Sequence, residues 1–285
     1  MKISVSSYSF GGYNDTLGIK GLIDKAAELG FDGFEFCYGG WTNNFDLELA
    51  KELKEYTLSK GLEPDSAVTG ADFLNGSNGV LEDEIKRLYK EIDFAAALGV
   101  KKMRHDTAYG FAGGRKYSIG FDDALPRIIK GCSEVTKYAE QKGVKTMTEN
   151  HGFFAQDSCR VEKIINGVAS PNFGALVDIG NFMCADEDPV KAVGILAPYA
   201  IHVHAKDFFW KSGMDVNPGS GWFRTRAGNY LRGAIVGHGD GKACQSLNIL
   251  KRAGYDDYVA IEFEGMEDNI KGIALGLENI KRFIG

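Results

Sequence analysis

Four potential metal ligands each follow a short, apolar stretch of the chain. They are Glu149, Asp178, His204 and Glu262, and the residues before them are mostly β-branched or small. Such a run is typical of a strand buried on both faces, and ligands at the carboxyl ends of parallel strands meet at one rim. Three carboxylates and one imidazole make an oxygen-rich site that suits Mn²⁺, Mg²⁺ or Co²⁺ better than a thiolate-type zinc centre. We therefore predict one divalent metal site, with Mn²⁺ as first choice and Zn²⁺ as a further alternative.

Two of these positions have a competing neighbour of the same type. His202 and His204 share a strand face, as do Glu262 and Glu264, because side chains two residues apart point the same way. We select His204 because it lies nearer the rim, and Glu262 because Glu264 falls in the following loop. His202 is then expected to be a deeper, packed or hydrogen-bonded histidine, and Glu264 an outer carboxylate.

Other polar residues stand near predicted strand ends and are candidates for substrate binding. His105 ends the fourth predicted strand, His151 follows the fifth, and Lys206 shares the strand face of His204. Glu35 also stands near a predicted strand end. Lys206 is placed to bind a substrate oxygen or the outer shell of the metal. The alternative for each residue taken singly is structural, such as capping a helix or pairing with an opposite charge.

The longest connection, residues 208–237, follows the seventh predicted strand and shows no clear periodicity. Connections of this length are usually functional or mobile. Trp222 and Arg224 within it are predicted to contact a polar substrate, and a guanidinium there is suited to a phosphate or carboxylate. A surface flap with scattered charge is the alternative.

The elements that must position these residues form a regular strand–helix alternation. Helical spacing and terminal glycines predict helices, for example over 17–29, 45–60, 80–98 and 122–142. The predicted strands cover residues 2–10, 31–37, 62–69, 100–105, 144–149, 173–178, 200–205 and 258–263. Eight such units imply a parallel sheet that closes into a (β/α)8 TIM barrel, with residues 1–285 as a single domain.

Composition excludes several classes of protein. A net charge of −6 argues against a nucleic-acid partner, and 44% hydrophobic with 25% charged residues is ordinary globular usage. No run is long enough to cross a membrane, and the amino terminus starts directly as a strand, so a cytoplasmic location is expected. The five scattered cysteines indicate reduced thiols rather than a disulfide framework or a structural zinc site.

The motifs resemble those of the xylose isomerase-like TIM barrel superfamily, the sugar phosphate isomerase/epimerase family. They are Glu149-Asn-His, Asp178-Ile-Gly-Asn, His202-Val-His-Ala-Lys-Asp, Val236-Gly-His-Gly-Asp and Val259-Ala-Ile-Glu-Phe-Glu-Gly. The resemblance implies a divalent metal held by Glu149, Asp178, His204 and Glu262, and it implies that Glu149 and Glu262 also shuttle a proton. Asn181 departs from the pattern, because ketose 3-epimerases have a histidine there.

The first functional hypothesis is therefore a metal-dependent isomerase or epimerase of a sugar, keto-sugar or cyclitol, acting by proton abstraction next to a carbonyl. A lyase or dehydratase acting on an inosose, a dehydroshikimate or a 3-keto-glycoside uses the same enolate. DNA repair by an endonuclease IV-like site is disfavoured, because five histidines are too few to converge on three zinc ions. A non-catalytic subunit, a homo-oligomer and a hetero-subunit assembly are left open, as is the identity of the carbohydrate substrate.

Overall fold

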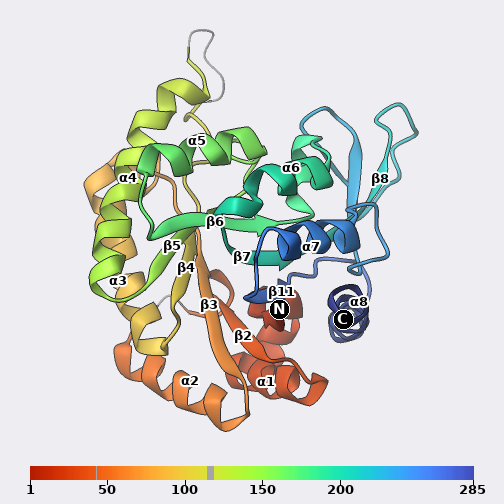
Figure 1. The fold of residues 1–285 in the computed structure, drawn as a ribbon, viewed down its shortest axis with the longest axis horizontal. Coiled ribbons are helices and arrows are strands. Elements are labelled where there is room, and N and C mark those ends of the chain that lie inside the picture. The colour runs from red at the N-terminus through yellow and green to blue at the C-terminus, as the bar shows by residue number, and fades with distance from the viewer. Residues whose placement is uncertain (43, 114–118) are drawn as a thin grey trace.

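Eight parallel strands close into a barrel in the computed structural model, which describes residues 1–42, 44–113 and 119–285 (Figure 1). Around the barrel the strand order is β1-β11-β7-β6-β5-β4-β3-β2. The strands are β1 (Lys2–Ser6), β2 (Gly33–Cys37), β3 (Glu63–Thr69), β4 (Lys102–His105), β5 (Lys145–Glu149), β6 (Phe173–Asp178), β7 (Ala200–Ala205) and β11 (Tyr258–Ile261). The predicted (β/α)8 barrel is thus confirmed.

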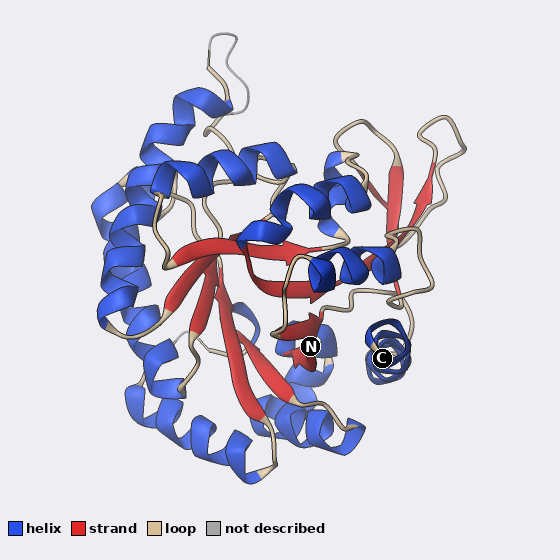
Figure 2. Cartoon of the chain, in the orientation of Figure 1, coloured by secondary structure: helices blue, strands red, loops and turns tan. Residues whose placement is uncertain are grey.

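Helices follow the strands and surround the barrel, as Figure 2 shows. They are α1 (Tyr13–Leu29), α2 (Leu47–Ser59), α3 (Leu81–Leu98), α4 (Phe121–Gln141), α5 (Ser158–Val168), α6 (Pro189–Leu196), α7 (Ala243–Arg252) and α8 (Asn269–Ile284). Local signals set their ends: Asp188 caps α6 through the backbone N–H groups of Val190 and Lys191, with Pro189 in the first turn. Gly99 ends α3 in the left-handed conformation, at φ 84°.

Apolar side chains fill the layer between the barrel and its helices. Every residue of β6 is buried, as expected for a strand covered on both faces. The fully buried members of this layer include Val5, Phe34, Phe36, Met103, Val177, Val203 and Ile261 from strands and Leu22, Leu53, Leu88, Ile128, Ile164, Leu196, Leu247 and Ile280 from helices. This core makes the barrel rigid, so that residues at the strand ends keep fixed positions.

Residues 207–234 differ from the expected irregular connection, because they form a three-stranded antiparallel sheet. Its strands are β8 (Asp207–Lys211), β9 (Phe223–Arg224) and β10 (Tyr230–Ala234), in the order β8-β10-β9. Phe208 is fully buried and packs with Leu231 and Met183 in a small core of its own. The strands are short and separated by turns, so they leave no long alternating pattern in the sequence.

A second difference concerns the first predicted strand. Only residues 2–6 are extended, while Ser7–Phe10 form a 3-10 helix that the Ser6 side chain caps by accepting from the Tyr8 N–H. An apolar run fits either conformation, and the hydroxyl cap decides between them. None of the helices in the described ranges is both long enough and apolar enough to cross a bilayer.

Candidate metal centre

The barrel brings the four predicted ligands together at the carboxyl ends of its strands. Glu149, Asp178, His204 and Glu262 each offer one donor atom, and these atoms lie within 4.8 Å of one another. All four side chains are buried. Three of them end or nearly end β5, β6 and β7, and Glu262 follows the last residue of β11, so four strands that are neighbours in the barrel carry the cluster.

A hydrogen-bonded link fixes two of these strand ends. The Asn150 side-chain amide donates to the Asp178 carbonyl at 2.9 Å, and its oxygen accepts from the Asp178 N–H at 2.9 Å. The Asp178 carboxylate then accepts from the Asn181 N–H at 2.9 Å through Oδ1. Because this oxygen is occupied, Oδ2 is the one left for the cluster.

Two buried polar atoms in the cluster make no hydrogen bond to any described residue, His204 Nδ1 and Asp178 Oδ2. His204 Nδ1 faces Glu262 Oε2 at 3.4 Å, Asp178 Oδ2 at 3.8 Å and Glu149 Oε1 at 3.9 Å. An unpaired buried polar group is costly, so such atoms usually mark a site for water, an ion or a ligand. Together with the oxygen-rich donor set, they fit a hard divalent cation.

Two cationic side chains, those of Lys206 and Arg104, pair with different carboxylates of the cluster. Lys206 Nζ lies 2.6 Å from Glu262 Oε2, 3.4 Å from Asp178 Oδ2 and 3.6 Å from Glu264 Oε2. Arg104 pairs with Glu149 Oε2. Buried carboxylates this close together need compensating charge, which these two side chains supply.

The pKa values of two carboxylates in the cluster, Asp178 and Glu262, shift in opposite directions. Burial, reinforced by Glu149 and Glu262, raises the pKa of Asp178 to about 7 even though Lys206 opposes it. Burial also acts on Glu262, but Lys206 and His204 outweigh it and hold the pKa of Glu262 well below its usual value. Lys206 and His204 therefore outweigh burial at Glu262 but not at Asp178, and the two carboxylates differ in pKa.

The structure places two of the predicted substrate-binding residues beside the cluster. Lys206 contacts it directly. His151 lies one step further out, with Nδ1 3.1 Å from Asp106 Oδ1, and Asp106 in turn pairs with Arg104 at 3.0 Å. The His151 side chain is 39% exposed, so it can reach a bound molecule.

The other three predicted substrate-binding residues lie elsewhere. His105 is fully buried and packs against Phe73 and Phe173. Trp222 and Arg224 belong to the appended sheet region, where Arg224 donates to the Gly228 carbonyl at 2.8 Å and to the Tyr230 hydroxyl at 2.7 Å. These contacts give His105 and Arg224 structural partners that the sequence could not reveal.

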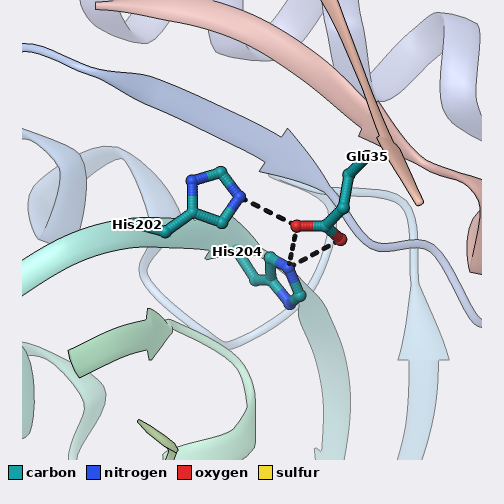
Figure 3. A group of neighbouring side chains, drawn as sticks. All are labelled: Glu35, His202 and His204. Carbon is teal, nitrogen blue, oxygen red and sulfur yellow. Dashed lines mark hydrogen bonds and ion pairs between the residues drawn. The ribbon is translucent and has the colours of Figure 1, made fainter. Parts of the chain in front are cut away.

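One charged residue at the site, Arg104, was missed in the sequence, and Glu35 was noted only for its place near a predicted strand end. Arg104 precedes His105 on β4, and the alternation along that strand was a usable signal, since neighbouring side chains face opposite sides. Glu35, on β2, hydrogen-bonds to both His202 and His204 (Figure 3). Its strand lies across the barrel from β7, and no local pattern indicates that contact.

The fold and the buried cluster together define a TIM-barrel protein with a candidate divalent-metal centre at the carboxyl ends of its strands. The chain belongs to the xylose isomerase-like TIM barrel family, whose model matches residues 23–283.

Two relatives with named activities and one solved epimerase structure are similar to this chain. The chain is 25% identical to the 3-oxo-isoapionate decarboxylase of Pectobacterium atrosepticum, over 73% of this chain and 69% of the relative. It is 24% identical to the inosose dehydratase of Glaesserella parasuis, over 67% and 65%. An L-ribulose 3-epimerase structure superposes with a TM-score of 0.75 and 16% identity, over 99% of this chain and 94% of that one.

A family member from Mycobacterium smegmatis, solved in complex with magnesium, superposes with a TM-score of 0.74 at 17% identity, over 99% and 96% of the two chains. Its fold is therefore the same as that of this chain. The neighbours include an epimerase, a dehydratase and a decarboxylase, so the family is enzymatic while its reactions differ.

Proposed function

We propose that the protein is a divalent-metal-dependent enzyme that removes a proton next to a carbonyl of a sugar, keto-sugar or cyclitol and returns it to give an isomer or epimer. The observation that carries the proposal is the convergence of Glu149 and Glu262 with Asp178 and His204 within 4.8 Å. The two glutamates come from β5 and from the end of β11, which β6 and β7 separate in the barrel. A substrate carbon between them would meet a carboxylate on each side.

The residues present fit this chemistry. When bound, the cation would polarise the carbonyl oxygen and stabilise the negative charge that develops as the neighbouring C–H bond breaks. Glu149 and Glu262 would accept and return the proton, each within reach of one face of the substrate. Lys206 and His151 would bind substrate oxygens from the rim, since both lie beside the cluster. Mn²⁺ is the first choice of cation, with Mg²⁺, Co²⁺ or Zn²⁺ as alternatives.

A second candidate is a lyase, and a specific observation favours it. Glu149 pairs with Arg104, whereas Glu262 contacts Lys206, a side chain that can donate a proton, so the two glutamates do not have equivalent surroundings. In an elimination only one carboxylate need act as the base, while Lys206 or His151 donates a proton to the leaving oxygen. The decarboxylase and dehydratase among the relatives support this alternative.

The test is a metal-supplemented screen of ketoses, inososes and 3-keto-glycosides in deuterated water. Deuterium in recovered substrate or product reports proton abstraction, a stereoisomer or isomer supports the first candidate, and an unsaturated or cleaved product supports the second. We expect Glu262→Gln to lower turnover by at least about 100-fold, because a general base contributes that much or more. If the enzyme is an isomerase or epimerase, Glu149→Gln should lower turnover by a similar factor.

Glu162→Gln is the control, because Glu162 lies on α5 and hydrogen-bonds to Tyr199 far from the cluster. Full turnover by both active-site variants on an accepted substrate would overturn proton abstraction by these glutamates. Full activity of a protein stripped of all divalent ions would overturn the role of the metal.

A further inference from the structure

Figure 3 shows a second buried cluster, here called the deeper cluster, which shares His204 with the metal centre. Its other histidine, His202, lies two residues nearer the start of β7. The deeper cluster consists of Glu35, His202 and His204, all fully buried. We infer that Glu35 is a positioning residue, which holds the Nε2 edge of His204 and thereby presents Nδ1 to the cation. The inference rests on the proposed metal site.

Both oxygens of Glu35 are engaged with His204. Nε2 of His204 lies 3.0 Å from Glu35 Oε1 and 3.1 Å from Oε2. A carboxylate accepts hydrogen bonds only, so Nε2 is the nitrogen that carries the hydrogen. The other nitrogen, Nδ1, is then the one whose lone pair can bind a metal, and metal-binding histidines commonly have such a carboxylate partner.

The direction of the ring supports the same assignment. Nδ1 points at the three carboxylate oxygens of the metal centre, at 3.4, 3.8 and 3.9 Å, and makes no hydrogen bond to a described residue. Glu35 comes from β2, which β1 and β11 separate from β7 in the barrel. It therefore reaches across the barrel interior, and neither strand adjacent to β7 supplies this contact.

Glu35 is itself held in place. Ser66 donates to Glu35 Oε2 at 2.6 Å, and His202 Nε2 lies 2.9 Å from the same oxygen. His202 in turn approaches Asp65 Oδ2 at 3.6 Å, and Asp65 accepts from Ser4 at 2.6 Å. Because these side chains are buried and mutually bonded, the carboxylate has little freedom to rotate away from His204.

The same three residues also have the composition of a second metal site, but their bonding argues against one. The nitrogens and oxygens that would ligate the ion are already bonded to one another and to Ser66. His202 Nδ1 has no hydrogen-bond partner among the described residues, but Nε2 is the His202 atom that faces Glu35 and Asp65. At the metal centre, two facing atoms, His204 Nδ1 and Asp178 Oδ2, have no such partner. We therefore expect one ion per chain, bound at the metal centre of Glu149, Asp178, His204 and Glu262.

The experiment is titration calorimetry of the metal-free protein with Mn²⁺ and Zn²⁺, for the wild type and Glu35→Gln. The wild type should bind one ion per chain, and Glu35→Gln should bind 10- to 100-fold more weakly, which is about the cost of losing a ligand's hydrogen-bond partner. Glu91→Gln is the matched control, because Glu91 is equally buried but pairs with Arg87 on α3. Its metal affinity should equal that of the wild type.

A spectroscopic measurement separates positioning from a general loss of structure. In the Zn²⁺-loaded wild type, two-bond ¹H–¹⁵N correlation spectra should show His204 with its proton on Nε2 and the metal on Nδ1. Glu35→Gln should lose this single pattern. If Glu35→Gln does not fold, Ser66→Ala removes one of the bonds that fix Glu35, and at least threefold weaker metal binding is expected.

The outcomes distinguish the two proposals. A wild-type protein that binds no divalent ion refutes the metal-dependent function. A wild type that binds, with Glu35→Gln binding within twofold and keeping the same His204 pattern, overturns the role of Glu35 alone. If Glu35→Gln is unfolded, an unchanged metal affinity in Ser66→Ala would likewise overturn the role of Glu35. Binding of two ions per chain would show that the deeper cluster is itself a metal site.

Discussion

At the scale of residues, the barrel holds several charged side chains that are largely shielded from water. Arg104, Lys206 and Glu35 are all buried, and each has an oppositely charged or hydrogen-bonding partner at the candidate metal centre. Burying a charge without a partner costs several kcal/mol, so these residues are tolerated only as a set. The arrangement that makes the site chemically useful is therefore also the one that keeps it folded.

His105 shows how burial alone changes a titration. Burial lowers the pKa of His105 to about 4, because its ring lies between Phe73 and Phe173. The ordinary value is about 6.5, so as the pH falls from 6.5 to 4 the unfolded chain takes up a proton that the folded chain does not. Proton binding therefore stabilises the unfolded state relative to the folded state as the pH falls. Because of His105, the free energy of unfolding should be about 2 kcal/mol lower at pH 5 than at pH 8.

We expect His105→Gln to remove this acid sensitivity, since glutamine does not titrate. Urea unfolding of both proteins at pH 8 and pH 5 is the measurement, and the fall in unfolding free energy between the two values should be about 2 kcal/mol smaller in the variant. The same substitution at the exposed His238 is the matched control. Identical pH dependence in His105→Gln and wild type would contradict the explanation.

At the scale of elements, one carboxylate ties the start of the appended sheet to the loop that follows its last strand. Asp207, at the start of β8, accepts from the backbone N–H groups of Phe208, Gly237, Gly239 and Gly241 at 2.8 to 2.9 Å. Gly233 on β10 also bridges to Gly265, and a side chain there would come within 2.3 Å of the Glu264 carbonyl oxygen. The sheet is thereby held against the loop that follows Glu262.

Asp207→Asn should destabilise this junction, because the amide places an N–H group among backbone donors. We expect the unfolding free energy to fall by about 2 to 3 kcal/mol, as for hydrogen bonds to a charged group. Urea unfolding measures the loss, and limited proteolysis between residues 212 and 229 should become faster. Asp240→Asn is the control, since exposed Asp240 accepts one backbone hydrogen bond, from the Trp210 N–H, among the residues that the structure describes. Equal stability of the two variants would refute this account.

At the scale of the whole molecule, the candidate metal centre joins four strands that come from different parts of the chain. A cation held by Glu149, Asp178, His204 and Glu262 binds only the folded protein, because the unfolded chain does not bring these residues together. Binding should therefore raise the stability of the entire barrel rather than of one element.

We expect Mn²⁺ at 100 times its dissociation constant to stabilise the protein by about 2.7 kcal/mol. For a domain of this size, the melting temperature should rise by about 5 °C or more, and a chelator should reverse the rise. Differential scanning calorimetry gives the measurement, and Asp178→Asn should show a much smaller shift. A melting temperature that ignores both metal and chelator would rule out a divalent site here.

Much of this molecule could be predicted from local patterns. The strands that end at Asp178 and Ala205 match their predicted ranges, since continuous apolar runs with clear ends are easily recognised. The convergence of the four candidate ligands followed from the same patterns, because parallel strands in a barrel place their carboxyl ends at one rim. Residues 7–10 and 207–234 were harder, because a hydroxyl cap and short antiparallel strands leave weak signals.

The sequence by itself determined the fold class and the four residues that meet at the rim, because both depend on repeating patterns within single strand–helix units. Only the tertiary structure decided that Arg104 and Lys206 neutralise the carboxylates, that His105 and Arg224 have structural partners, and that Glu35 holds His204 from across the barrel. These contacts join residues far apart in the chain. They depend on how the barrel closes and on the register between its strands, which no local pattern specifies.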